Sequence, residues 1–103
     1  MTTRNQEIAN TILIQMGGNR FIAMTGAKYF AIIENGLQFK LPNRFANKGI
    51  NCVQIVLDPS DTYTMKFLKI SGVNIREIEV IEGLFFDQLQ PIFTEQTGLD
   101  THL

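Results

Sequence analysis

Residues that build disulfides, metal sites or redox centres are scarce in this chain. Its 103 residues include one cysteine, one histidine and no tryptophan. The single thiol, Cys52, cannot form a disulfide within the chain, and its place beside Val53 predicts a small residue on a strand. His102 is next to last, where chains usually fray, so we expect it to be solvated rather than to act as a base or a ligand. These scarcities predict no metal site and no cofactor.

Long apolar stretches are also missing. The longest purely aliphatic runs span only a few residues, far fewer than the roughly 20 needed to cross a bilayer. The opening MTTRNQEIAN lacks the apolar segment of a signal peptide. A content of 45% hydrophobic and 18% charged residues is nevertheless too apolar for a disordered tail. We therefore expect one domain over residues 1–103, without membrane contact and in a bacterial cytoplasm.

No set of side chains has a recognisable catalytic spacing. Ser60 and Ser71 fall in expected turns and have no histidine partner. Glu77 and Glu79 share one face of an expected strand, but acid–base catalysis by two carboxylates needs a pocket and a raised pKa. We interpret them as the exposed side of an edge strand and predict that the protein is not an enzyme.

The stretch GGNRFIAMTGAK, residues 17–28, gathers three glycines, a threonine and two cations around an apolar centre. A phosphate-binding loop of the Walker type needs a Gly-Lys-Ser/Thr ending followed at once by a helix. Here Lys28 is followed by Tyr29 and an apolar run, which predict a strand. We therefore expect a helix cap, a short strand and a tight turn.

The hydrophobic spacing predicts an α+β fold in which an antiparallel sheet of four to six strands, built from two hairpins, lies between an N-terminal and a C-terminal helix. Ile8, Ile12 and Met16 are four residues apart and indicate a helix over residues 3–16, capped by a left-handed Gly17. Strands are expected at residues 21–25, 29–33, 37–41, 53–57, 63–67 and 75–81.

Turn residues set the order of these strands. Residues 34–36 predict a tight hairpin, because Asn35 and Gly36 readily adopt the positive φ angles of such a turn. The Asp-Pro-Ser-Asp sequence at residues 58–61 predicts a second reversal. We expect Asn35 and Gly36 to occupy the first turn themselves.

The position of Pro91 leaves the start of the closing helix open. Proline is tolerated in the first turn of a helix, so the helix either begins near Asp87 or is kinked at Pro91. Gly98 is expected to end this helix.

Charge is segregated along the chain, although the net charge is only −1. Residues 20–69 carry seven cations and three anions, whereas residues 77–103 carry six anions and no cation. A basic surface attracts polyanions, so this segregation is the best functional lead in the sequence. The cations of the basic segment and a neighbouring aromatic ring form a candidate nucleic-acid-binding set: Arg20, Lys28, Lys40, Arg44, Phe45, Lys48, Lys66 and Lys69.

Two functional classes stay open. In the leading expectation the protein acts by protein–protein interaction, with Phe85 and Phe86 or an exposed sheet edge binding a host protein or a second copy in a homodimer. In the alternative, a sheet face with Lys40 and Lys66 and the loop at residues 42–50 bind single-stranded DNA or RNA.

Four stretches that together span nearly the whole chain carry a family pattern: GGNRFIAMTGAK, NGLQFKLP, DTYTMKF and EGLFFDQLQPIFTEQTGL. The pattern resembles a family of small uncharacterised proteins encoded by tailed phages and prophages, from which Pro91 departs. The resemblance implies a phage-type accessory protein and no particular chemistry. In layout, curved antiparallel strands with a closing helix are also similar to the single-stranded-DNA-binding transcriptional coactivator and Whirly families.

Overall fold

The computed structural model describes residues 3–42 and 45–101. In this part of the chain, three α-helices and two short 3-10 helices accompany a five-stranded antiparallel sheet. The elements are, in chain order, α1 (Thr3–Met16), α2 (Gly18–Thr25), β1 (Lys28–Ile33), β2 (Gly36–Lys40), η1 (Asn47–Gly49), β3 (Cys52–Leu57), β4 (Tyr63–Ser71), β5 (Asn74–Leu84), η2 (Phe86–Gln88) and α3 (Leu89–Thr97). The predicted α+β class, with an antiparallel sheet of four to six strands and a helix toward each end of the chain, is confirmed.

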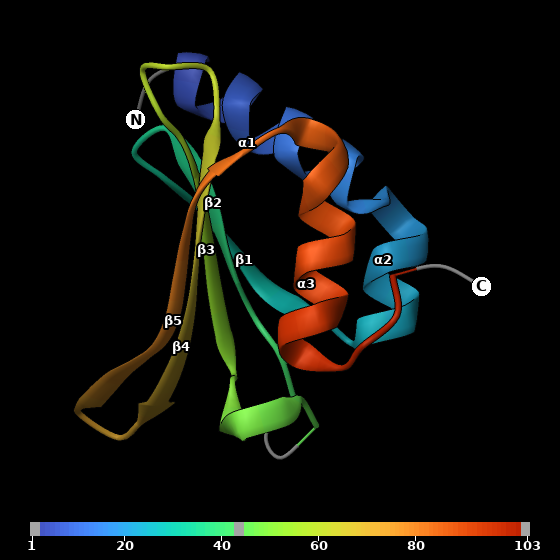
Figure 1. The fold of residues 1–103 in the computed structure, drawn as a ribbon, viewed down its shortest axis with the longest axis vertical. Helices are drawn as coiled ribbons and strands as arrows, with labels where there is room; N and C mark the ends of the chain where they lie inside the picture. Colours follow the sequence, from blue (N-terminus) through green and yellow to red (C-terminus); the bar gives the residue numbers. More distant parts are fainter. Residues whose placement is uncertain (1–2, 43–44, 102–103) are drawn as a thin grey trace.

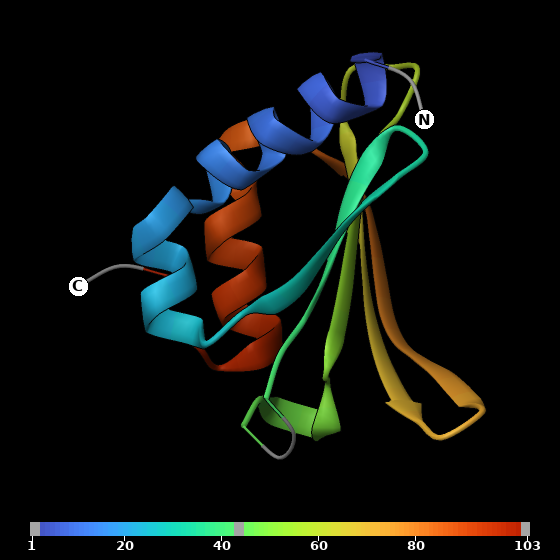
Figure 2. The same ribbon diagram turned by 180° about the vertical axis from the view of Figure 1, so that it is seen from behind.

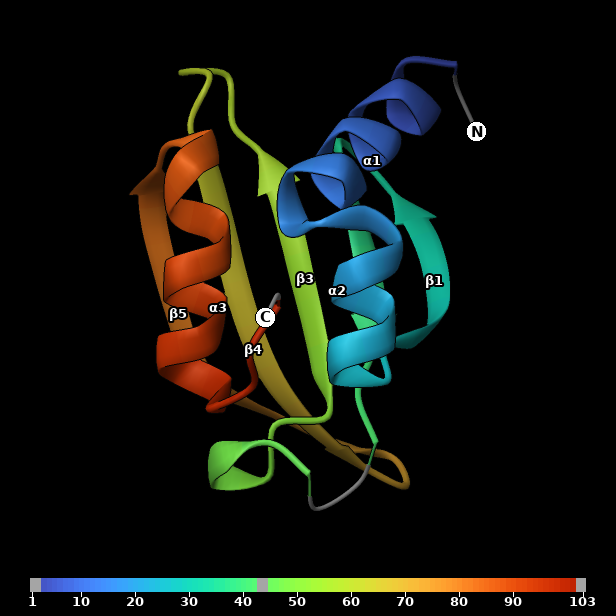
Figure 3. The same ribbon diagram turned by 90° about the vertical axis from the view of Figure 1, so that its right-hand side faces the viewer.

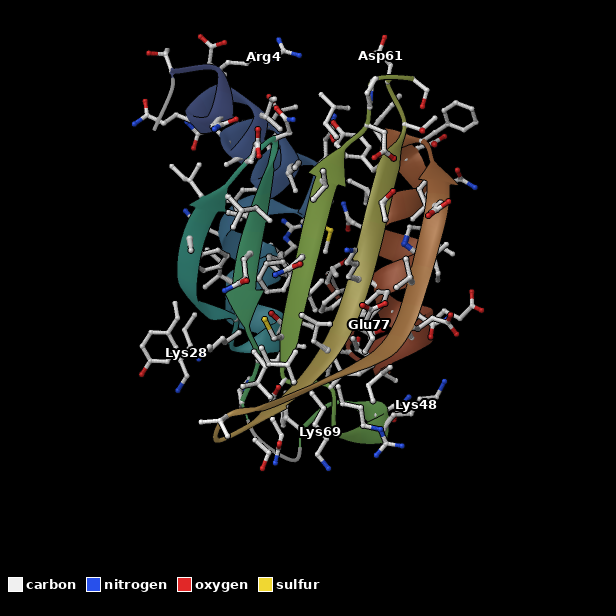
Figure 4. The ribbon with its side chains drawn as sticks, turned by 90° about the vertical axis from the view of Figure 1, so that its left-hand side faces the viewer. Arg4, Lys28, Lys48, Asp61, Lys69 and Glu77 are labelled. Atoms are coloured by element: carbon white, nitrogen blue, oxygen red, sulfur yellow. The ribbon has the colours of Figure 1, made fainter. Side chains whose placement is uncertain are left out.

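The helices and the sheet form two layers (Figure 1). The strands lie side by side in the order β1 to β5, so each strand pairs with its neighbour in sequence. α1 and α2 lie over the β1 to β3 side of the sheet, and α3 lies over the β4 and β5 side (Figure 3). Among the described residues no helix covers the other face of the sheet, which we call the open face (Figure 4).

Three phenylalanine rings join the two layers. The ring centroid of Phe21 in α2 lies 5.2 Å from that of Phe39 in β2 and 5.4 Å from that of Phe93 in α3, both in edge-to-face geometry. All three side chains are fully buried. Such pairs contribute about 0.5–1.5 kcal/mol each beyond the burial of their area. They fix α2 and α3 at one place on the sheet.

The strand predicted at residues 21–25 is wrong, because these residues belong to α2. Phe21 and Thr25, one helical turn apart, are the buried residues of this helix. A run of five bulky residues is too short for its period to separate a strand from a helix. Gly17, with φ 118°, lets the chain bend from α1 into α2 (Figure 2), so the predicted left-handed residue after the first helix is confirmed.

α2 and α3 end with the same local sequence, in which Thr-Gly follows a phenylalanine at a spacing of four residues. In α2 the hydroxyl of Thr25 donates to the carbonyl of Phe21 at 2.8 Å, and in α3 the hydroxyl of Thr97 donates to that of Phe93 at 2.7 Å. The glycine after each threonine is left-handed, with φ 71° and 76°. The glycine stop predicted for the closing helix is confirmed, and the same motif ends α2.

The first hairpin has its turn one residue earlier than predicted. Glu34 and Asn35 form the turn, and Asn35 has φ 57°, whereas Gly36 is the first residue of β2 and pairs with Ile33. A Cβ atom on Gly36 would collide with the carbonyl oxygen of Ile55 on β3. The prediction that Gly36 occupies the turn is wrong, since this glycine serves the close approach of two strands.

The second predicted reversal is confirmed. The N–H of Asp58 donates to the carbonyl of Thr62 at 2.8 Å, and the N–H of Asp61 donates to the carbonyl of Asp58 at 3.0 Å. A further two-residue turn, which the sequence did not predict, joins β4 to β5 at Gly72 and Val73. The end of this β4–β5 hairpin bends away from the helices and across the lower part of the open face (Figures 1 and 4).

The closing helix starts late enough to accept its proline. η2 precedes α3, and Pro91 is the third residue of α3, so of the two alternatives the placement in the first turn is correct. Glu77 and Glu79 are exposed on β5, an edge strand, as interpreted from the sequence. None of the helices within residues 3–42 and 45–101 is long and apolar enough to cross a bilayer.

Candidate functional site at the basic end of the sheet

The open face is polar along its middle. Side chains alternate between the two faces of a strand, so residues between the buried Val53, Ile55 and their neighbours point away from the helices. Gln38, Gln54 and Lys66 form one such row across β2, β3 and β4. The amide nitrogen of Gln54 donates to the amide oxygen of Gln38 at 2.7 Å. The row is therefore ordered but presents hydrogen-bonding groups to solvent.

Several lysines gather at one end of the sheet. Lys28, Lys48 and Lys69 lie at the end where the β4–β5 hairpin turns, and Glu77 of β5 lies on the same half of the sheet, whereas Asp61 and Arg4 lie at the other end (Figure 4). Two further cations lie at this end of the sheet: Lys40 is the last residue of β2, and Arg76 pairs with Lys69. We call the exposed cations of this region the basic end: Lys28, Lys40, Lys48, Lys69 and Arg76.

Two pairs of like charges face each other within the basic end. Lys28 pairs with Lys40 across β1 and β2, and Lys69 pairs with Arg76 across β4 and β5. Like charges directly opposite on neighbouring strands destabilise a sheet. Among the described residues, no carboxylate forms an ion pair with any of these four side chains.

An open pocket of about 440 Å³ lies beside the first pair. It is lined by Lys28, Tyr29, Lys40, Leu41, Pro42, Asn51, Ile70 and Gly72. Asn51 holds the hairpin wall in place, since its amide nitrogen donates to the carbonyl of Ile70 and its amide oxygen accepts from the N–H of Ile70, both at 2.8 Å. The pocket thus lies between the start of β1, the end of β2 and the β4–β5 hairpin.

Tyr29 enters this pocket through an irregularity in β1. A bulge interrupts pairing between Lys28 and Ala31, and Tyr29 has φ 55°. A left-handed conformation at a bulky residue costs on the order of 1–3 kcal/mol, and such outliers concentrate at functional sites. The Tyr29 side chain is 69% exposed, and Lys28 Nζ lies 5.3 Å from its ring centroid, within cation–π range. The bulge re-aims Tyr29 so that it lines the same pocket as Lys28.

The structure brings together only part of the predicted nucleic-acid-binding set. Lys28, Lys40, Lys48 and Lys69 belong to the basic end, and Phe45, 56% exposed, shortly precedes η1 in the chain. Lys66 lies in the middle of the open face, as predicted for that face.

Arg20 of the predicted set stands apart from this group. Arg20 is in α2 and lines a different hollow together with Gln90 of α3, so it belongs to the helical layer. Arg44 and His102 lie outside the described residues.

Tyr29, Asn51 and Arg76 are site residues that sequence reasoning missed. No pattern in the sequence marks the bulge that turns Tyr29 toward Lys28. The Gly72 turn was the available signal for Arg76, because a two-residue turn there places Arg76 opposite Lys69.

The single thiol of the chain is the remaining chemical group of note. Cys52 is fully buried in β3, as expected of a strand residue, and burial raises the pKa of its thiol, while the charge of Lys40 opposes that rise. In the part of the chain that the structure describes, no three His, Cys, Asp or Glu side chains group closely enough to hold a metal ion.

The predicted Phe85–Phe86 site lies toward the opposite end. Leu84 ends β5 opposite Tyr63, the first residue of β4, so the two phenylalanines follow at the end of the sheet far from the β4–β5 hairpin. Both rings are exposed, Phe85 by 60% and Phe86 by 62%. The N–H of Phe85 donates to the side-chain oxygen of Gln88 at 2.8 Å, which fixes the start of η2 and leaves both rings in solvent.

Fold and site together define a class of small α+β protein: an antiparallel meander with helices on one face and an open face that ends in a basic pocket. Comparisons of the chain with family models, with curated proteins and with solved structures found no match.

Proposed function

We propose that this protein binds single-stranded nucleic acid through the basic end of its sheet. The main support for this proposal is that two like-charge pairs, Lys28 with Lys40 and Lys69 with Arg76, lie at the same end of the sheet. A phosphate backbone would neutralise cations of this end, and lysine and arginine gain affinity by displacing its counterions.

Exposed aromatic rings support a single strand as the ligand. Tyr29 is 69% and Phe45 56% exposed, and both lie in or next to elements that contribute cations to the basic end. Unpaired bases stack on such rings irrespective of sequence, while cations follow the backbone. Gln38, Gln54 and Lys66 continue a polar path onto the open face.

A net charge of −1 does not oppose this proposal. The molecule measures 34 × 33 × 23 Å, whereas exposed charges are screened beyond about 8 Å at physiological salt. A nucleic-acid strand bound at the basic end therefore interacts mainly with the cations of that end.

Salt-dependent binding tests the proposal. Affinity for a labelled single strand, measured by fluorescence anisotropy from ~50 mM salt upward, should fall steeply with salt. Replacing Lys28 and Lys40 together by alanine should lower the salt slope by about 1.4, at about 0.7 per phosphate contact.

Arg20→Ala is a control for that experiment, because it removes one cation from the helical layer and none from the basic end. It should leave affinity and slope unchanged. Absence of binding to single-stranded DNA and RNA at ~50 mM salt would refute the proposal.

A second candidate function is protein binding through Phe85 and Phe86, in line with a phage-type accessory role. Two adjacent phenylalanines exposed by 60% and 62% favour it, because large rings left in solvent mark interaction surfaces. Replacing both by serine should abolish binding of a protein partner and leave nucleic-acid affinity unchanged. Loss of nucleic-acid affinity in that variant would assign the rings to the first function instead.

A further inference from the structure

We infer that the pocket at the basic end takes a phosphomonoester, either the terminal phosphate of a strand or that of a free nucleoside monophosphate, in preference to an internal phosphodiester. The inference rests on the proposed function for its ligand class and goes further by naming the group that the pocket selects.

Charge matching favours a monoester. Lys28 and Lys40 are direct partners across β1 and β2, and both line the pocket. An internal phosphodiester carries a single negative charge and can neutralise only one of them. A phosphomonoester carries about −1.5 to −2 at pH 7, so it neutralises the pair.

The size and walls of the pocket favour binding of the terminal nucleotide of a nucleic-acid strand. Leu41 and Pro42 lie on one side, and Ile70 and Gly72 of the β4–β5 hairpin lie on the other. Its volume of about 440 Å³ is within the usual range for small-molecule sites, which is roughly 300–1,000 Å³. A site of that size suits one nucleotide unit, and Asn51 holds the hairpin wall through its two hydrogen bonds to Ile70.

Tyr29 supplies a surface for the base attached to that phosphate. Its ring lies next to Lys28 Nζ, 5.3 Å away, so a phosphate held by Lys28 places its own nucleoside beside the ring. The strained φ of 55° presents the tyrosine to solvent instead of to the core. Because stacking tolerates any base, the pocket should recognise the phosphorylated end without selecting a sequence.

Oligonucleotides that differ only at their ends test the inference. One labelled single strand is prepared with a 5′-phosphate, a 3′-phosphate or hydroxyls at both ends, and its affinity is measured by anisotropy. One phosphorylated form should bind about 10-fold more tightly than the hydroxyl form. This preference should shrink from pH 7.5 to pH 5, because the second pKa of a phosphomonoester is about 6.

Single replacements locate the effect. Lys28→Ala and Lys40→Ala should each remove most of the preference for the phosphorylated end. Lys66→Ala is the matched control, since Lys66 is a lysine of the same sheet outside the pocket; it should weaken all three oligonucleotides alike and leave the preference unchanged. Tyr29→Leu should weaken adenosine monophosphate more than inorganic phosphate, as judged by the shift of the thermal unfolding midpoint.

The outcomes separate this inference from the proposed function. Equal affinity for all end groups overturns the inference and leaves strand binding intact. Binding of adenosine monophosphate but of no strand supports the inference and refutes the proposed function. If no oligonucleotide binds, and neither adenosine monophosphate nor inorganic phosphate binds, both the inference and the proposed function are overturned. A preference that survives both pocket lysine replacements also overturns the inference.

Discussion

Gly36 is needed for space rather than for backbone freedom. It is buried at the start of β2, its φ is not positive, and a Cβ atom there would meet the backbone of Ile55 and Val56 on β3. Gly36→Ala should therefore reduce the free energy of unfolding by about 1–3 kcal/mol, as overpacking does. Urea unfolding at neutral pH measures this loss.

Lys40→Ala is the control on the same strand. Lys40 is exposed and faces Lys28, so its removal relieves a repulsion and should leave stability unchanged or slightly higher. An unchanged stability in Gly36→Ala would contradict the close approach of β2 and β3.

Cys52 should make the free energy of unfolding depend on pH in the alkaline range. Burial raises the pKa of its thiol above the ordinary value of 9.0, with a smaller opposing effect of Lys40. The unfolded chain then loses the thiol proton before the folded chain does. The stabilisation is complete below about pH 9 and is lost as pH rises through the folded pKa.

The measurement is urea unfolding at pH 7.5 and pH 9.5. The protein should be less stable at the higher pH, and Cys52→Ala should show a smaller difference between the two values. Burial also raises the pKa of Tyr63 from 10.0, so that residue acts mainly above this range. An equal loss in the protein and in the variant would exclude Cys52 as the cause.

At the scale of elements, the two Phe-x3-Thr-Gly ends explain how short helices are closed. Thr25 and Thr97 are buried, and each donates to the carbonyl four residues earlier while accepting from an N–H two residues later at 3.2 Å. Thr25→Val and Thr97→Val keep the shape but remove the acceptor. Each should cost about 1–3 kcal/mol, the usual effect of leaving a buried polar group unpaired.

Thr11→Val is the control for these two variants. Thr11 is exposed on α1, so the same substitution should change stability by less than about 0.5 kcal/mol. If all three variants were equally stable in urea unfolding, the buried hydroxyls would have no role in closing α2 and α3.

At the scale of the whole molecule, we predict a homodimer. Phe85 and Phe86 are exposed together just after β5, an edge strand of the sheet. A two-fold dimer is the commonest way to cover such surfaces. Light scattering at micromolar concentration should give about twice 11.7 kDa.

Two variants locate the dimer contact. The double variant Phe85→Ser, Phe86→Ser should have the mass of a monomer. Phe45→Ser, near the basic end, should keep the mass of the dimer. A mass of 11.7 kDa for the unmodified protein at every concentration would remove the prediction.

Local sequence determined most of the fold. The spacing of Ile8, Ile12 and Met16 marks α1, and alternation in β2, β3 and β4 separates a buried face from a polar one. These patterns are readable because a helix and a strand repeat every 3.6 and 2 residues, whatever they pack against. The residues of α2 fill too short a segment for that distinction, and its helical state depends on the packing of Phe21 against Phe39 and Phe93.

The sequence by itself determined that the chain is α+β, that its charge is segregated and that its cations fall in the central segment. Only the tertiary structure decided which cations meet. Strand pairing places Lys28 against Lys40 and Lys69 against Arg76, while it leaves Arg20 in the helical layer. The physical reason is that register and bulges arise from contacts between distant segments, so the electrostatics of the site exists only once the sheet has formed.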